Sequence, residues 1–425
     1  MGLVVCQGIY GFGFAYHNPY TTKVEENLPL SRPLHFNKLL IKTGLVSRED
    51  VYTFKRTDVK GAMNYPLNKL DCSGGEGYNI VFLVVDALRF DMITEQIMPN
   101  VTAFSKNAIT FKDHYSGGIN TRHGIFTLFS GIPGSYWDSS KASKSGSSLI
   151  EALQTRGYEI GLFASLPNIR LNSKGNNPME KDVSAIEDME KWLTSLPKNK
   201  PFFAFLFLDS VHSAIFPETE EFTVFKPYWK EVNQIKLSND FDRTPYFNRY
   251  ENSVYFTDKN LARALNFVGQ HIDMDKTIIV ITADHGEEFN DTGKNYWGHN
   301  GNFTKYQAQI PFIVKWPDKP SVEIVYRTSS LDVVPTLLPR VLGCKNPVSD
   351  YSVGKDLFDP NGRNPFVYVS NYSKDAFVEK DRVVLINELG VLSFLDPSYN
   401  PSKDKTVPPY LKQVLEESSR FMKKN

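Results

Sequence analysis

The stretch Thr277 to Gly301, TIIVITADHGEEFNDTGKNYWGHNG, decides how the rest of the chain is interpreted. Its first residues, Thr277 to Thr282, are β-branched, which is typical of a buried strand. The strand ends at Asp284 and His285, and a second histidine, His299, follows in the loop. A carboxylate and an imidazole at the end of a strand are well placed to bind a metal ion, because open α/β sheets keep their sites at the carboxyl edge.

Composition places the chain among ordinary globular proteins. It has 425 residues, 41% of them hydrophobic, and 48 basic side chains balance 48 acidic ones. Because the formal charge is zero, no overall field attracts nucleic acid, and we expect no nucleic-acid partner. Three cysteines are too few for a disulfide framework, although a bridge between Cys72 and Cys344 in an oxidising compartment remains open. The absence of a Cys-x-x-Cys pair argues against a thiolate zinc site.

The N-terminal part is predicted to be a connector. Residues 1–16, MGLVVCQGIYGFGFAY, are apolar but shorter than the ~20 residues that a membrane span needs. We interpret them as the end of a juxtamembrane segment whose transmembrane part lies outside this sequence; a buried strand or an interfacial segment fits the composition equally well. The glycine-rich stretch 73–77 predicts a flexible joint. The predicted domains are therefore a connector, 1–72, and a catalytic domain, 73–425, with a small C-terminal subdomain at 365–425.

After the joint, predicted strands and helices alternate, which indicates a layered α/β/α fold. Near the C-terminus, short strands separated by turns predict a small antiparallel unit that a helix at 409–422 closes. Strands are predicted at 79–85, 108–112, 158–164, 202–208, 277–282, 310–315, 366–370, 382–387 and 390–395. Helices are predicted from 86 to about 103, from 121 onward, and at 147–155, 183–196, 246–271 and 331–342.

Polar residues follow several of the predicted strands or begin a helix, and in a layered fold these positions meet at one edge. Asp86, Asp284 and His285 offer an oxygen-rich ligand set that suits manganese, magnesium or zinc. Thr121 is expected to be the N-cap of its helix, where a metal ion would lower the pKa of its hydroxyl and make it a nucleophile. The helix N-terminus would face an incoming anion.

Further side chains are expected near this edge. His212 and His299 are predicted to hold an anion or to protonate a leaving group. Asn120 and Arg122 are weaker candidates for substrate contacts, and Glu287 and Glu288 are expected either to face solvent or to be hydrogen-bond partners of the ligands. This set predicts phosphoryl or sulfuryl transfer through a covalent threonine intermediate.

Five motifs in the same order resemble the alkaline phosphatase and sulfatase superfamily. They are NIVFLVVDALR (79–89), TRHGIFTLFSG (121–131), ADHGEEF (283–289), WGHNG (297–301) and SLDVVPTLL (330–338). The resemblance implies a three-layer α/β/α sandwich with a mixed, mostly parallel central sheet. It also implies a site that binds divalent metal.

Two residues differ from the pattern of true sulfatases. Thr121 stands where sulfatases carry the cysteine or serine that becomes formylglycine, so a sulfuric ester hydrolase is the less favoured alternative. Ala87 replaces the second acidic residue of the sulfatase opening motif.

A chain with a threonine nucleophile resembles instead the membrane-anchored phosphotransferases, such as lipoteichoic acid synthase and the phosphoethanolamine transferases. That likeness implies one divalent ion (manganese, zinc or magnesium), with a second left open, bound by Asp86, Thr121, Asp284 and His285. It also implies that His212 binds the substrate phosphate and that His299 lies beside it.

The chain is also similar to the YejM-like family of bacterial inner-membrane proteins, through NLPLSRPL (27–34), GIFTLFSGIPGSYWD (124–138) and GKDLFDP (354–360). This implies a soluble domain that faces the periplasm and is joined to the inner membrane by N-terminal transmembrane segments. One hypothesis is a phosphotransferase or phosphatase acting on a phospholipid or another lipid-linked phosphate. The alternative is a lipid-binding regulator of lipopolysaccharide homeostasis with little or no turnover.

Overall fold

The computed structural model describes residues 42–43, 63–164, 177–198, 200–233, 236–387 and 390–423. The N-terminal stretch 1–16, interpreted above as juxtamembrane, lies outside these residues. None of the helices in the described part is both long and apolar enough to cross a membrane. The chain divides into two compact units. The larger is Asn64–Trp137 with Ser145–Met422, and the smaller is Met1–Met63 with Asp138–Lys144 and Lys423–Asn425.

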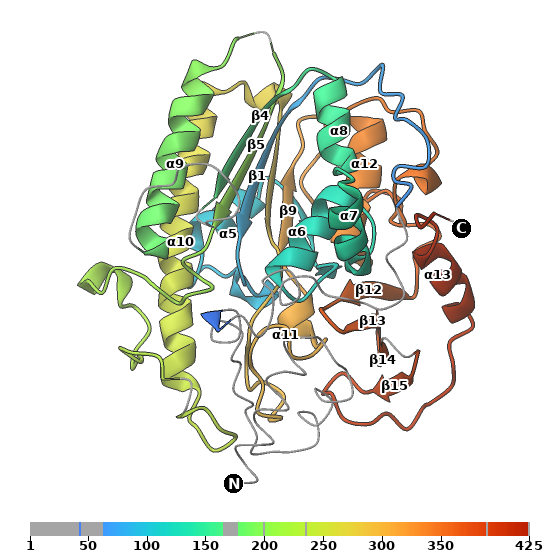
Figure 1. Cartoon of the computed structure of the whole chain (residues 1–425). Helices are drawn as coiled ribbons and strands as arrows, with labels where there is room; N and C mark the ends of the chain where they lie inside the picture. Colours follow the sequence, from blue (N-terminus) through green and yellow to red (C-terminus); the bar gives the residue numbers. More distant parts are fainter. Residues whose placement is uncertain are drawn as a thin grey trace. The chain divides into compact units, whose positions relative to one another are not determined.

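A seven-stranded mixed sheet forms the middle of the larger unit (Figure 1). Its strands are β1 (Asn79–Val85), β2 (Ile109–Phe111), β4 (Glu159–Ala164), β5 (Phe202–Leu208), β6 (Thr277–Ala283), β9 (Phe312–Lys315) and β10 (Val322–Ile324). Their order across the sheet is β10-β2-β9-β6-β1-β5-β4. β1 is parallel to both β5 and β6, whereas β9 is antiparallel to β2 and β6. The predicted mixed, mostly parallel sheet is therefore confirmed.

β1 shows why this sheet is covered on both faces. Successive side chains of a strand point to opposite faces, so the uninterrupted apolar run NIVFLVV has to be buried from two sides. Phe82 packs into one hydrophobic cluster, with α6 (Thr121–Ser130), α8 (Ser148–Thr155) and α12 (Val333–Arg340). Leu83 packs into the other, with α5 (Pro99–Ser105), α9 (Pro178–Ser195) and α10 (Thr244–His271). The helices lie on the two sides of the sheet in Figure 1, as a three-layer α/β/α sandwich requires.

A second, antiparallel sheet follows near the C-terminus, in the order β12 (Phe366–Ser370), β13 (Lys374–Glu379), β14 (Val383–Asn387) and β15 (Leu392–Leu395). α13 (Leu411–Ser418) packs on one face through Leu411. The other face contacts Tyr115 and Ile119 of the segment that leads into α6. The small sheet is thus attached directly beside the start of α6.

Several boundaries differ from the prediction. The helix predicted from 86 to about 103 is wrong in extent, because only the 3₁₀ helix η2 (Phe90–Met92) and α5 form there. Pro99 occupies the first turn of α5, where its missing N–H costs nothing, so it begins a helix rather than continuing one. The strand β13 was not predicted.

The shorter elements are η3 (Gly134–Tyr136), α7 (Trp137–Ser143), η4 (Glu220–Phe222), η6 (Met274–Lys276), α11 (Lys305–Ala308), η7 (Ser330–Asp332), η8 (Val348–Asp350), and the pairs β3 (His114–Tyr115) with β11 (Thr328–Ser329) and β7 (Glu288–Phe289) with β8 (Trp297–Gly298).

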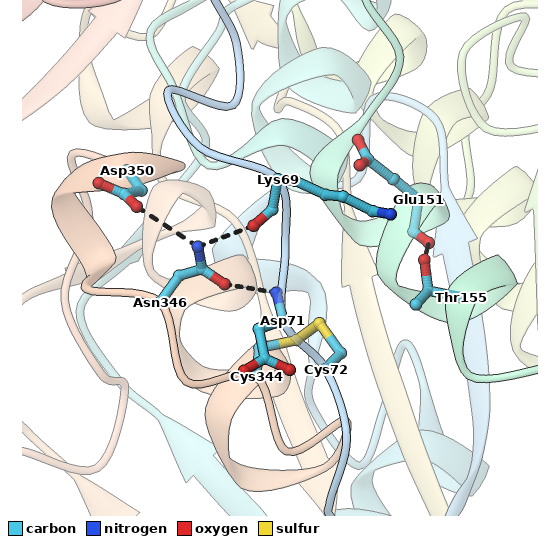
Figure 2. The surroundings of a disulfide bond; sticks show 8 residues. All are labelled: Lys69, Asp71, Cys72, Glu151, Thr155, Cys344, Asn346 and Asp350. Carbon is cyan, nitrogen blue, oxygen red and sulfur yellow. Dashed lines mark hydrogen bonds between the residues drawn. A yellow bond between two sulfur atoms is a disulfide. The ribbon is translucent and has the colours of Figure 1, made fainter.

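A disulfide joins Cys72 to Cys344 and closes a sequence separation of 272 residues (Figure 2). Asn346 supports the same contact: its amide accepts a hydrogen bond from the backbone N–H of Asp71 (2.6 Å) and donates one to the carbonyl of Lys69 (3.1 Å). The segment before β1 is therefore bound covalently and by hydrogen bonds to the residues after α12. The bridge between Cys72 and Cys344, which the sequence alone did not decide, is present in the structure.

Replacing both cysteines with serine should destabilise the protein. The bridge closes a very long loop, so its loss increases the entropy of the unfolded chain, and we expect the free energy of unfolding to fall by about 3 to 5 kcal/mol. Urea unfolding of the Cys72→Ser/Cys344→Ser variant checks this, with Cys6→Ser as the control that keeps the bridge. Equal midpoints for the double variant and the parent protein would contradict the prediction.

Candidate metal centre and active site

Three aspartates lie level with one another at the carboxyl edge of the sheet. In the strand register, Val85 of β1 is opposite both Leu208 of β5 and Ala283 of β6. The next residue of each strand is an aspartate: Asp86, Asp209 and Asp284. All three are buried. Because these strands are parallel neighbours, the register alone brings three carboxylates to one place.

Asp284 and His285 are held in place by the backbone around them. Asp284 Oδ1 accepts hydrogen bonds from the N–H groups of Ala87 (3.1 Å) and His285 (2.8 Å). Ala87 adopts the left-handed conformation (φ 59°), which is uncommon for a residue other than glycine. The Nδ1 of His285 lies 2.9 Å from the carbonyl of Gly286. Since a carbonyl only accepts, Nδ1 carries the proton and Nε2 presents a lone pair.

Oxygen atoms of three side chains lie close to this Nε2. It lies 3.3 Å from Asp86 Oδ1, 3.5 Å from Asp284 Oδ2 and 3.4 Å from the Thr121 hydroxyl. The same hydroxyl lies 3.4 Å from Asp86 Oδ2. Ligands bound to one ion at about 2.0 to 2.2 Å must lie within roughly 4.4 Å of one another, and these four distances are shorter than that. The donor atoms of Asp86, Asp284 and His285 all lie within 4.8 Å of one another. The structure thus brings together the four residues that the sequence suggested as metal ligands.

Close packing of α6 makes this approach possible. A side chain at Gly124 would place its Cβ 2.1 Å from the carbonyl oxygen of Asp284, so only glycine allows the helix to lie so near the end of β6. The expected N-cap is corrected: Asn120, not Thr121, caps α6, and its side chain accepts from the N–H of His123 (3.0 Å). Thr121 is the first helical residue. An asparagine cap frees the threonine hydroxyl to face Asp86.

Asp209 is a residue that we missed from the sequence, where only His212 of the same loop was selected. Its Oδ1 lies 3.3 Å from His212 Nδ1. The Asp209 carboxylate raises the pKa of His212 to about 10, and Asp86 and Glu287 add to this effect. The available signal was its position, directly after an apolar strand like Asp86 and Asp284. Asp182 of α9 holds the loop by accepting from the N–H groups of Asp209 (2.8 Å) and Ser210 (2.9 Å).

The ring of His299 lies close to the rings of both His285 and His212. The ring centroids of His299 and His285 are 4.3 Å apart, and those of His299 and His212 are 5.1 Å apart. His299 Nδ1 lies 2.8 Å from Glu287 Oε2, so the carboxylate orients the ring. Glu288 is fully buried and accepts from Thr292, Asn302, Thr304 and Gln307. Glu287 and Glu288 were expected either to face solvent or to bond to the ligands. Exposure to solvent is wrong, because both are buried, and both support the loop that carries His299.

Two other candidates have different surroundings. Asn120 uses its amide within the protein, because its Nδ2 also donates to Asn300 Oδ1 (3.0 Å). Arg122 is exposed and lies over the rings of Trp137 and Tyr372. No hydrogen bond or ion pair connects Arg122 to the proposed ligands in the described part of the chain.

The buried groups of this cluster fit a cation. Asp86 Oδ1 and Asp284 Oδ2 are buried and accept no hydrogen bond from the residues that the structure describes. Burial and the neighbouring Asp284 raise the pKa of Asp86 well above its usual range, and burial raises the pKa of Asp284 to about 6. Burial lowers the pKa of His285 well below its ordinary value. A divalent cation would neutralise the two carboxylates and pair with the free oxygens and the imidazole lone pair.

Metal affinity should therefore increase with pH. Below about pH 6 a proton occupies the Asp284 carboxyl and has to leave before an ion binds, so we expect the Kd for Mn²⁺ to weaken about tenfold for each unit below this pH. Titration calorimetry between pH 5 and 8 checks this, and an affinity independent of pH would contradict it.

An α/β/α sandwich with such a cluster at the carboxyl edge defines the alkaline phosphatase-like class of fold, and comparison with known proteins agrees. The sulfatase family model matches residues 78–343, so the chain belongs to the sulfatase family. It is 27% identical over 420 residues to the inner membrane protein YejM of Salmonella typhimurium LT2, which covers 96% of this chain and 67% of the relative. The chain thus spans about two thirds of that relative's length.

Solved structures show the same fold. The phosphonate monoester hydrolase of Agrobacterium radiobacter superposes with a TM-score of 0.61 at 14% identity, over 81% of this chain and 96% of that one. A protein in the alkaline phosphatase superfamily from Vibrio parahaemolyticus has a TM-score of 0.54 at 16% identity, over 85% and 87%. At these identities the likeness concerns the fold, and the predicted family and fold class are confirmed.

Proposed function

We propose that this protein is a metal-dependent phosphoryl-transfer enzyme with Thr121 as its nucleophile. The observation that carries the proposal is the position of the Thr121 hydroxyl, 3.4 Å from both Asp86 Oδ2 and His285 Nε2 at the first residue of α6. Capping does not explain this position, because Asn120 and not Thr121 caps α6.

Asp86, Thr121, Asp284 and His285 would hold the ion. When bound, a divalent cation lowers the pKa of the hydroxyl and stabilises charge on the transferring group. Asp209 and His212 form a further donor group with Asp86, all within 4.8 Å of one another. Because the two groups share Asp86, we propose that a second ion can bind next to the first.

The chain's own residues account for the remaining steps. The Thr121 hydroxyl gives its proton toward Asp86 Oδ2 as its oxygen bonds to phosphorus and the bond to the leaving oxygen breaks. The free N–H groups in the first turn of α6 face the developing negative charge. His212 or His299 donates a proton to the leaving alkoxide. Water then releases phosphate from phosphothreonine, or an acceptor alcohol takes the phosphoryl group.

We propose a phospholipid headgroup or another lipid-linked phosphate at the periplasmic face of the bacterial inner membrane as the substrate. This rests on the relative named an inner membrane protein. The same likeness supports a second candidate function, a YejM-like lipid-binding regulator with little turnover. A sulfuric ester hydrolase is less favoured, because Thr121 cannot be converted to formylglycine.

An assay with two matched esters tests the proposal. We expect the purified protein to hydrolyse 4-nitrophenyl phosphate with Mn²⁺, Zn²⁺ or Mg²⁺, to lose this activity in EDTA, and to hydrolyse 4-nitrophenyl sulfate at least about tenfold more slowly. If neither ester is hydrolysed with any of these metals, the enzyme proposal fails and the regulator is favoured. Faster hydrolysis of the sulfate ester would favour the sulfatase alternative.

A further inference from the structure

Arg122 is an exposed cation directly after the proposed nucleophile. Thr121 and Arg122 are the first two residues of α6, and their Cα atoms are about 3.8 Å apart, so both side chains extend from the same end of this helix. Its guanidinium carbon lies 5.0 Å from the ring centroid of Tyr372 and 5.7 Å from that of Trp137. Among the described residues no carboxylate or carbonyl is bonded to it. Arg89 differs in this respect, because it is buried and paired with Asp91 and Asp291.

The small C-terminal sheet brings Tyr372 to this place. The last residue of β12, Ser370, bridges to Gly118 in the segment before α6. Its N–H donates to the carbonyl of Gly117 (3.0 Å), and its carbonyl accepts from the N–H of Ile119 (3.2 Å). These backbone bonds hold the following turn, with Tyr372, against the start of α6. Tyr372 remains 39% exposed and also contacts the ring of His123 (5.2 Å).

The two aromatic rings restrict how Arg122 can bind. Guanidinium groups stack on aromatic rings through their faces, which leaves the N–H groups at the edge for a ligand. That planar edge matches two oxygens of a phosphate, and charge-assisted bonds of this kind are stronger than neutral ones. A divalent ion held by Asp86, Asp284 and His285 would bind the reacting phosphate without Arg122.

We propose that Arg122, positioned by Tyr372 and Trp137, binds a second phosphate of the substrate, so that the site selects a phosphomonoester that carries another phosphate group. This inference rests on the proposed function, and it adds a substrate class. A lipid headgroup or a soluble sugar phosphate could supply such a group, and both share the chemistry that Arg122 would recognise.

Matched substrates test the proposal. Phosphate release is measured with glucose 6-phosphate against glucose 1,6-bisphosphate, and in detergent micelles with phosphatidic acid against phosphatidylglycerol phosphate. We expect kcat/KM to be at least tenfold higher for the member of a pair that has the second phosphate. A preference in the lipid pair alone identifies a lipid headgroup as the source, and a preference in both pairs identifies the shared phosphate chemistry.

Variants of Arg122 and Tyr372 test whether these two residues cause the preference for a second phosphate. Arg122→Ala should reduce kcat/KM for the preferred substrates by about tenfold to a hundredfold and change it less than about threefold for the others. Arg122→Lys should restore part of the preference, since it keeps the charge without the planar fork. Tyr372→Ala should lower the preference by about threefold to tenfold, and Tyr372→Phe should retain it. The matched control is Lys319→Ala, which removes a cation 4.4 Å from the ring centroid of Phe358. This variant should leave kcat/KM unchanged for both members of each pair.

Failure of this proposal can be told from failure of the proposed function. If the parent protein hydrolyses both members of each pair equally well, or if Arg122→Ala keeps the preference, the second-phosphate site is excluded while phosphoryl transfer stands. If no substrate is hydrolysed, the proposed function fails. The second-phosphate site is then tested by calorimetry, which measures how tightly the metal-loaded protein binds the two members of each pair. Tighter binding of the bisphosphate that is lost in Arg122→Ala supports the site, and equal binding overturns it.

Discussion

Replacing Thr121 with alanine is expected to lower kcat for 4-nitrophenyl phosphate by at least about 10³-fold. The reason is that the variant lacks the oxygen that forms the bond to phosphorus, and losses of a nucleophile are of this size or larger. Folding should be preserved, because Asn120 and not Thr121 caps α6. The measurement is steady-state kinetics with metal in excess, together with the Tm of both proteins.

Thr121→Ser is the control for this result. Serine keeps the hydroxyl near Asp86 and His285, so activity within about tenfold of the parent protein is expected. Rapid acid quenching followed by mass spectrometry should find a phosphoryl group on a peptide that contains residue 121 in the parent protein and not in the alanine variant. Activity of Thr121→Ala near the parent level would remove threonine from the mechanism and leave the fold assignment intact.

Replacing Asp284 with asparagine should have opposite effects on metal binding and on the stability of the metal-free protein. Loss of a direct ligand should weaken Mn²⁺ binding by at least about 100-fold, since the loss of a supporting residue alone costs 10- to 100-fold. Without metal, the new amide side chain keeps an oxygen that can accept from Ala87 and His285, and the buried repulsion with Asp86 is removed. The metal-free variant should therefore unfold at an equal or higher temperature than the parent protein.

Asp258→Asn is the matched control for the Asp284 variant. Asp258 is also a buried aspartate that accepts backbone hydrogen bonds, from Asn100 (3.1 Å) and Val101 (2.9 Å), but it lies on α10 and not at the edge of the sheet. Its replacement should lower Tm and leave metal affinity unchanged. Thermal unfolding with and without Mn²⁺ separates these outcomes. A full metal-induced rise in Tm for Asp284→Asn would contradict its role as a ligand.

Local patterns were sufficient to predict much of the fold. The apolar runs of β1 and β5 were located to the residue, because a strand covered on both faces has no polar position until it ends. Proline and short alternating segments were less informative: the helix predicted after Asp86 is interrupted before Pro99, and β13 was not predicted. Glu287 and Glu288 follow the Asp-His-Gly turn as charged residues, and nothing local indicates that partners from the same loop bury them.

The sequence by itself determined that Asp86, Asp284 and His285 terminate apolar strands and that Thr121 begins a helix, because each of these properties depends only on neighbouring residues. Only the tertiary structure decided that Asp209 is level with Asp86 and Asp284, because that depends on the order and register of β6, β1 and β5. It also decided the bridge from Cys72 to Cys344 and the place of Tyr372 beside Arg122. The physical reason is the same in each case: these contacts join residues far apart in the chain, and they exist only once the sheet has assembled and the loops at its edges have packed.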